Sequence, residues 1–132
     1  HEYPNCDRDP LPRWSFGRVT LLGDAAHPMY PVGSNGASQA ILDARSLAEC
    51  LRIHESVEAA LASYDAERRP ITAQIVHSNR KGGPEGVIDL VEDRAPDGFD
   101  DIEAVASHAE RERVVRGYAQ LAGFAAQGME GR

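Results

Sequence analysis

An aspartate, a histidine and three glycines stand close together near the start of the chain, and sites with residues of these types can bind a polar ligand or move a proton. The run Gly23-Asp24-Ala25-Ala26-His27-Pro28 follows the apolar residues 19–22, and Pro31-Val32-Gly33-Ser34-Asn35-Gly36 leads into an alanine-rich segment. A strand, a glycine-bearing turn and a helix in this order place a carboxylate and backbone N–H groups around a ligand. Residues 18–36 are therefore predicted to form a ligand-binding corner.

The elements around this corner can be predicted from their hydrophobic patterns. Residues 19–22 are apolar without alternation, which predicts a strand buried on both faces, usually in a parallel sheet. From Ala37 the period is helical, and Asp43 lies off the apolar face. That predicted face consists of Ala40, Ala44, Leu47, Ala48 and Leu51. Ser56 can cap a second helix, which we expect to kink or restart at Pro70 and to continue towards residue 81.

Gly82-Gly83-Pro84 is the clearest boundary in the chain and divides residues 1–81 from residues 82–132. Beyond it we expect a helix to about Arg94 and a turn over residues 95–98. A capping box at Asp100 and Glu103 predicts another helix, and a last amphipathic helix contains Tyr118, Leu121, Ala122 and Ala125 before fraying through Gly128 and Gly131. The expected fold class is an α/β fragment, mostly helical, with one or two short strands followed by four to five helices.

Composition excludes several classes of function. A net charge of −7 disfavours nucleic acid and anionic membranes as partners. No apolar run approaches the roughly 20 residues that span a bilayer, and the first residues lack a signal pattern, so we expect a cytoplasmic protein. Cys6 and Cys50 fit no metal spacing and are expected to be reduced thiols.

The order of motifs resembles the flavin-dependent aromatic hydroxylases of the para-hydroxybenzoate hydroxylase type. Their second flavin-contacting motif has a strand, Gly-Asp-Ala-Ala-His, Pro-x-Gly-x-x-Gly and a helix. The run of residues 37–43 is most similar to the branch that contains the phenazine-carboxylate hydroxylase, and residues 64–70 resemble the Tyr-Glu-x-x-Arg-Arg-Pro helix of the family. The resemblance covers residues 13–81 and implies that residues 1–81 are the C-terminal portion of a Rossmann-like FAD-binding domain, with 82–132 as a helical extension.

The resemblance also implies roles for individual residues. Asp24 would accept hydrogen bonds from the ribityl hydroxyls of FAD, and the amides of Ala37 and Ser38 would face the flavin pyrimidine ring. Glycines would allow close approach of the isoalloxazine ring. The implied cofactor-binding residues are Gly23, Asp24, Pro31, Gly33, Gly36, Ala37 and Ser38. No catalytic residue and no metal ligand is assigned, because His27 is expected to support the loop. Arg68 and Arg69 are expected to form ion pairs or to lie at a helix end, and not to bind the substrate.

The activity that the resemblance implies is hydroxylation of an aromatic substrate with FAD, NAD(P)H and O2. A Gly-x-Gly-x-x-Gly fingerprint for the FAD pyrophosphate does not occur in the sequence. We therefore expect the chain to belong to a longer enzyme, to be inactive alone and to bind FAD weakly or not at all.

Two alternatives remain open from the sequence. The chain could be a non-catalytic interaction module with a vestigial flavin motif, which forms homo-oligomers through an unpaired strand and apolar helix faces. It could also be a hydrolase that uses Asp24, His27 and Ser34 or Ser38, although no nucleophile-elbow pattern is present.

Overall fold

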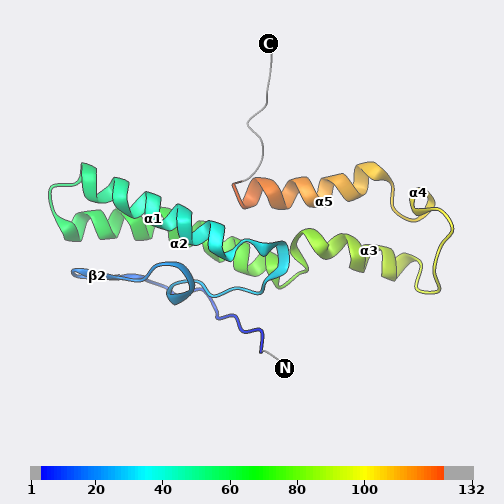
Figure 1. The fold of residues 1–132 in the computed structure, drawn as a ribbon, viewed down its shortest axis with the longest axis horizontal. Helices are drawn as coiled ribbons and strands as arrows, with labels where there is room; N and C mark the ends of the chain where they lie inside the picture. Colours follow the sequence, from blue (N-terminus) through cyan, green and yellow to red (C-terminus); the bar gives the residue numbers. More distant parts are fainter. Residues whose placement is uncertain (1–3, 124–132) are drawn as a thin grey trace, which may run out of the picture.

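The computed structural model describes residues 4–123, which form an elongated arrangement of two helical units (Figure 1). Helices α1 (Gly36–Ile53) and α2 (Val57–Asn79) lie side by side in one unit. Helices α3 (Gly86–Arg94) and α5 (His108–Leu121) form the other, with the short α4 (Ile102–Val105) between them. The expected fold class is confirmed, because the described residues are mostly helical with two short strands. The predicted tail at Ala125, Gly128 and Gly131 lies outside the described residues.

The two strands form a hairpin beneath α1 and α2 (Figure 1). Strand β1 (Ser15–Phe16) pairs antiparallel with β2 (Val19–Thr20), and Gly17 has a φ of +60° in the two-residue turn between them. Glycine at the first central position is typical of a hairpin turn. The prediction of a buried parallel strand over residues 19–22 is wrong: Val19 is 65% exposed and the strand has two residues. The Gly17 turn instead pairs the segment with its nearest neighbour in the chain.

Helix α1 buries a polar face. Asp43 is fully buried, whereas Ala44, Ala48 and Leu51 of the predicted apolar face are exposed, so that prediction is wrong. The buried residues follow helical spacing and are Gln39, Asp43, Ser46 and Cys50. Helix α2 makes this burial possible because it supplies hydrogen-bonding partners, such as Glu67, whose carboxylate accepts from Ser46 Oγ at 2.9 Å.

Helix α2 begins as predicted and runs on past Pro70. The Ser56 side chain accepts a hydrogen bond from the Ala59 amide at 3.2 Å, which confirms the cap. The helix does not restart at Pro70; Pro70 itself is exposed, and the Thr72 hydroxyl donates to the carbonyls of Arg68 and Arg69. The apolar core joins α1, α2 and the segment before α1, and its buried residues are Trp14, Ala26, Cys50, Ala60 and Tyr64. Ile75 and Val76 of α2 are also fully buried.

The region after α2 follows the sequence predictions in part. Helix α3 follows a 3-10 turn, η3 (Gly83–Glu85), and ends at Arg94, and the amide of Gly98 donates to the Ala95 carbonyl in the next turn. The capping box predicted at Asp100 does not form. Asp101 caps α4, and a capping box forms before α5 between Ser107 and Glu110.

The first described residues are tied to the end of α2. Arg80 donates to Asp7 Oδ2 at 2.5 Å and to Asp9 Oδ1 at 2.7 Å. Cys6 and Cys50 are both free. Within residues 4–123, no helix has the length and apolar character needed to cross a bilayer.

Candidate functional site

The Gly-Asp motif forms a tight 3-10 turn, η1 (Gly23–Ala25), directly against α1. Gly23 has a φ of +59°, and its carbonyl accepts from the amides of Ala26 and His27 at 2.8 and 2.9 Å. A Cβ on Gly23 would lie 3.2 Å from the Cβ of Ala40, so glycine lets the turn pack closely on the helix. Gly23 is buried and Asp24 is exposed, so the motif presents its carboxylate outwards.

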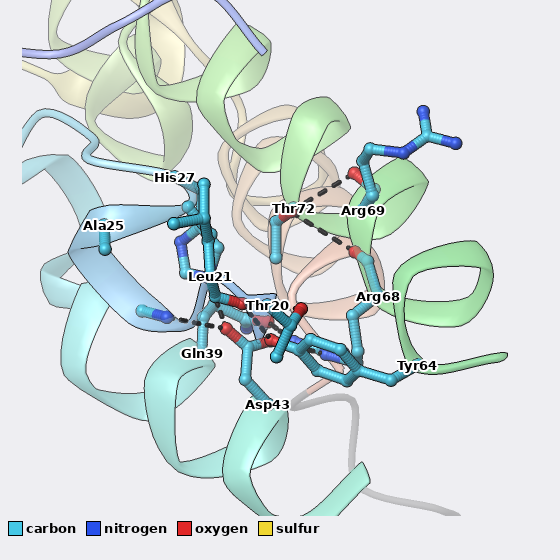
Figure 2. A network of polar contacts seen from close by, with 12 residues as sticks. Thr20, Leu21, Ala25, His27, Gln39, Asp43, Tyr64, Arg68, Arg69 and Thr72 are labelled. Atoms are coloured by element: carbon cyan, nitrogen blue, oxygen red, sulfur yellow. Dashed lines mark hydrogen bonds and ion pairs between the residues drawn. The ribbon is translucent and has the colours of Figure 1, made fainter. Parts of the chain in front are cut away.

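Behind this turn, Asp43 is the centre of a buried polar network (Figure 2). Its Oδ2 lies 2.5 Å from His27 Nε2, and its Oδ1 accepts from Arg68 Nε at 2.7 Å. The Gly23 amide donates to the same carboxylate at 3.2 Å. Burial alone would raise the pKa of Asp43, but the hydrogen bonds from His27 and Arg68 outweigh it and hold that pKa below its ordinary value.

The same network continues to the end of α5. Arg68 donates to Gln39 Oε1 at 2.7 Å, and Gln39 Nε2 donates in turn to the Ala122 carbonyl at 3.0 Å. Tyr64 joins from α2, because its hydroxyl donates to the Leu21 carbonyl at 3.1 Å. Burial raises the pKa of Tyr64. Groups from the motif, α1, α2 and the end of α5 thus hold one another in place.

The two glycines of the second motif face different neighbours. A Cβ on Gly33 would lie 2.5 Å from the Tyr118 hydroxyl, so this glycine lies directly beneath α5. A Cβ on Gly36 would have only ordinary contacts, at 3.8 Å from Met29 Cγ and 4.0 Å from Asp24 Oδ1. The structure therefore brings Gly36 beside Asp24 and places Gly33 against the C-terminal region.

The start of α1 is open for hydrogen bonding. No side chain caps it, and within residues 4–123 the amides of Ala37 and Ser38 have no hydrogen-bond partner. Among the other predicted site residues Pro31 is exposed. An exposed carboxylate next to free amides can bind a ligand that carries both hydroxyl and carbonyl groups.

The alternative reading as a hydrolase gains no support from the geometry. His27 is 4% exposed and pairs with Asp43, so Asp24 is not its acidic partner. Arg68 and Arg69 form ion pairs, as expected, since Arg69 Nε donates to Asp65 Oδ1 at 2.7 Å. No group of three His, Cys, Asp or Glu side chains that could hold a metal occurs among the described residues.

Hydrophobic periodicity missed the residues that support the site. Asp43 lies off the apolar face that the helical period predicts, and the sequence pattern gives Gln39 and Arg68 no role in the site. A signal was present in the polar residues four apart at Gln39 and Asp43, directly after the motif. Two polar positions at this spacing share one helix face and can meet a single basic side chain.

Comparison with known proteins identifies the family. Residues 7–79, more than half of the chain, match a family described as an FAD binding domain. The chain belongs to this family, whose cofactor is FAD. Together with relatives that are named as hydroxylases, the match confirms the resemblance that the motifs indicated.

Individual relatives agree with this assignment. The chain is 66% identical over 79 residues to phenazine 1,6-dicarboxylic acid hydroxylase PhzS of Lysobacter antibioticus, covering 60% of this chain and 19% of the relative. It is 46% identical over 82 residues to 3-hydroxybenzoate 6-hydroxylase 2 of Aquipseudomonas alcaligenes, covering 61% and 26%. It is 46% identical over 78 residues to 6-hydroxynicotinate 3-monooxygenase of Pseudomonas fluorescens, covering 55% and 20%. The matched region thus spans about a fifth to a quarter of each of these relatives.

Proposed function

We propose that the chain is part of a flavin-dependent monooxygenase that hydroxylates an aromatic substrate with FAD, NAD(P)H and O2. The observation that carries the proposal is the exposed Asp24 carboxylate beside Gly36, at the uncapped start of α1, within a segment that belongs to the FAD binding domain family. The names of the three relatives include a phenazine dicarboxylic acid, a hydroxybenzoate and a hydroxynicotinate. We therefore propose an aromatic carboxylate, such as a fused-ring one, as the substrate.

In this proposal the chain orients the flavin from one side. Asp24 accepts hydrogen bonds from ribityl hydroxyls, and the amides of Ala37 and Ser38 donate to a pyrimidine carbonyl of the ring. Gly36 leaves room for the ring, while exposed Pro31 borders the reaction space. Gly23 and Gly33 complete the set by shaping the two turns. FAD, when bound and reduced, supplies the oxygen chemistry, and the protein orients it and excludes water.

The organisation of the chain belongs to the same proposal. Residues 1–81 form the C-terminal portion of the FAD-binding domain and residues 82–132 a helical extension. A cytoplasmic location rests on the sequence composition. The 132-residue chain alone is proposed to be inactive and to bind FAD weakly or not at all. Stoichiometric, tight binding of FAD by this chain in a titration would contradict the last statement.

The test of the function uses the whole protein that the gene encodes. We expect it to copurify with FAD, measured by visible absorbance, and to oxidise NAD(P)H faster when an aromatic carboxylate is added. Asp24→Asn should lower the FAD content at least tenfold, because the neutral amide is a poorer acceptor for ribityl hydroxyls. Asp97→Asn, in an exposed turn, is the matched control and should keep its FAD. A wild-type protein without FAD, or an Asp24 variant that binds FAD normally, would overturn the proposal.

A second candidate is a non-catalytic module that forms homo-oligomers. The exposed apolar side chains of α1 favour it, since Ile41 is 70% exposed and Leu51 is 46% exposed, with Ala44 and Ala48 on the same helix also exposed. Light scattering over a range of concentrations tests this candidate. A mass that stays at that of the monomer would exclude homo-oligomers.

A further inference from the structure

The loop of residues 32–34, which lies just before α1, has an unfavourable backbone conformation. Within η2 (Val32–Ser34), Gly33 has a φ of +70° and Ser34 a φ of +48°. Ser34 is the one non-glycine residue with a positive φ in residues 4–123. L-residues rarely adopt this conformation, and it persists where neighbouring groups fix it. Groups from later in the chain hold this loop in its conformation.

Glu85 holds the loop from the 3-10 turn that precedes α3. Both of its carboxylate oxygens accept from the Gly33 amide, each at 3.1 Å. The two turns are also packed directly together, because a Cβ on Gly83 would lie 2.8 Å from Val32 Cγ1. The Gly33 amide is therefore bound by a residue 52 positions later in the chain.

Tyr118 holds the loop from α5. Its ring and hydroxyl lie within 2.7 Å of the position that a Gly33 Cβ would occupy, and the side chain is 8% exposed. The hydroxyl donates to Asn79 Oδ1 at 2.9 Å, and Asn79 Nδ2 donates to the Tyr30 carbonyl at 3.2 Å. This chain of hydrogen bonds connects α5 to the residue just before Pro31.

We propose that Glu85, Tyr118 and Asn79 form a loop clasp, a set of positioning residues that fixes the conformation of residues 30–35 and thereby the start of α1. Among the described residues, none of the three forms a hydrogen bond with Asp24, Ala37 or Ser38. Their effect passes through Gly33 and Ser34 to Gly36, which lies beside Asp24. The consequence for flavin binding rests on the proposed function, whereas the clasp itself is a property of this chain.

Hydrogen exchange on the whole chain tests the clasp. We expect Glu85→Ala to accelerate exchange of the Gly33 and Ser34 amides, which have acceptors in the wild type, at least tenfold, and Tyr118→Phe to accelerate it several-fold, with exchange in the middle of α2 unchanged. Glu92→Ala and Val115→Ala, at exposed positions of α3 and α5, are the matched controls and should leave these amides as in wild type. Glu85→Gln, which keeps a carbonyl acceptor, should restore part of the protection. Unchanged exchange in Glu85→Ala would overturn the clasp, and because Glu85 is exposed this variant decides the question even if Tyr118→Phe unfolds.

The whole protein that the gene encodes separates the clasp from the function. If it contains FAD, Glu85→Ala should release FAD at least threefold faster and alter the visible circular dichroism of the flavin, at an unchanged melting temperature. If Glu85→Ala released FAD at the wild-type rate and gave the wild-type dichroism signal, the clasp residues would not position the groups that bind the flavin. Loss of loop protection in a protein that never contains FAD would leave the clasp standing and overturn the proposed function. If Glu85→Ala left the exchange of the loop amides as in wild type in a protein that contains FAD, the clasp would be overturned and the proposed function would stand.

Discussion

The flavin motif has a closed side and an open side, although the same few residues form both. On the closed side, Gly23, His27 and Gly33 are bound by Asp43, Tyr118 and Glu85 from other parts of the chain. On the open side, the Asp24 carboxylate and the first amides of α1 have no partner within the described residues. The difference shows that neighbouring motif residues serve separate purposes. Substitutions on the closed side should affect folding, and those on the open side should affect FAD binding.

The largest expected effect is that of Asp43→Asn. It removes the charge that compensates buried Arg68 and the carboxylate oxygen that lies against His27 Nε2, and breaking such a buried pair costs about 3–5 kcal/mol. The matched variant on the open side is Asp24→Asn, which should change the free energy of unfolding by less than about 0.5 kcal/mol because Asp24 is exposed. Urea denaturation measures both. If the two substitutions changed the free energy of unfolding equally, the distinction between a closed and an open side would be wrong.

The two glycines provide a second matched pair. Gly33→Ala puts a methyl group 2.5 Å from the Tyr118 hydroxyl at a positive φ. We expect a loss of about 3 kcal/mol, since the left-handed conformation costs roughly 1–2 kcal/mol and overpacking roughly 1–3 kcal/mol. Gly36→Ala should change stability by no more than about 1 kcal/mol, because its site has space and α1 begins there. Thermal unfolding ranks the two, and a more destabilising Gly36→Ala would contradict the assignment of sides.

Tyr118→Phe should have a smaller effect on the closed side. It removes the hydrogen bond to Asn79 Oδ1 and keeps the ring, so a loss of about 1 kcal/mol is expected. Tyr30→Phe is the control, because the hydroxyl of half-buried Tyr30 makes no hydrogen bond within residues 4–123. Urea denaturation at neutral pH should separate the two variants. If Tyr118→Phe and Tyr30→Phe were equally stable, the Tyr118 hydroxyl would not contribute to the stability of the closed side.

The last prediction concerns how the stability of the folded chain changes as the pH falls into the acid range. The pKa of Asp43 is lowered from 3.8 in the folded chain, so the folded state binds fewer protons than the unfolded state. Its contribution to stability is therefore complete above about pH 3.8 and is lost as the pH falls towards the folded pKa. The pKa of Asp65 is also lowered, by its hydrogen bonds to the Trp14 amide and Arg69 against the effect of burial. Melting temperatures measured below about pH 5 should fall less steeply for Asp43→Asn than for wild type.

Features set by nearby residues could be predicted from the sequence. Ser56 caps α2, α3 ends at Arg94 and a turn follows at residues 95–98, all as expected. The order of motifs also led to the FAD binding domain family. In each case the signal lies in a few consecutive residues, because caps and turns depend on local hydrogen bonds.

Features that depend on distant partners could not be predicted. Burial of Asp43 requires Arg68, which is 25 residues away in sequence, and a charged residue without a known partner is expected at the surface. The approach of Tyr118 to Gly33 likewise depends on the packing of α5 against the loop. The capping box is a different error, since it was expected at Asp100 and Glu103 and forms instead between Ser107 and Glu110.

The double ion pair of Arg80 has a consequence for the evolution and engineering of this chain. It joins Asp7 and Asp9 to the end of α2, and these are the two ends of the segment that matches the family, residues 7–79. Segments whose ends meet tolerate insertion and circular permutation, because both junctions lie at one place. Both covalent junctions of the segment therefore lie in one region of the surface, whereas an exchange with the segment of a relative must also keep its contacts with Glu85, Tyr118 and the Ala122 carbonyl.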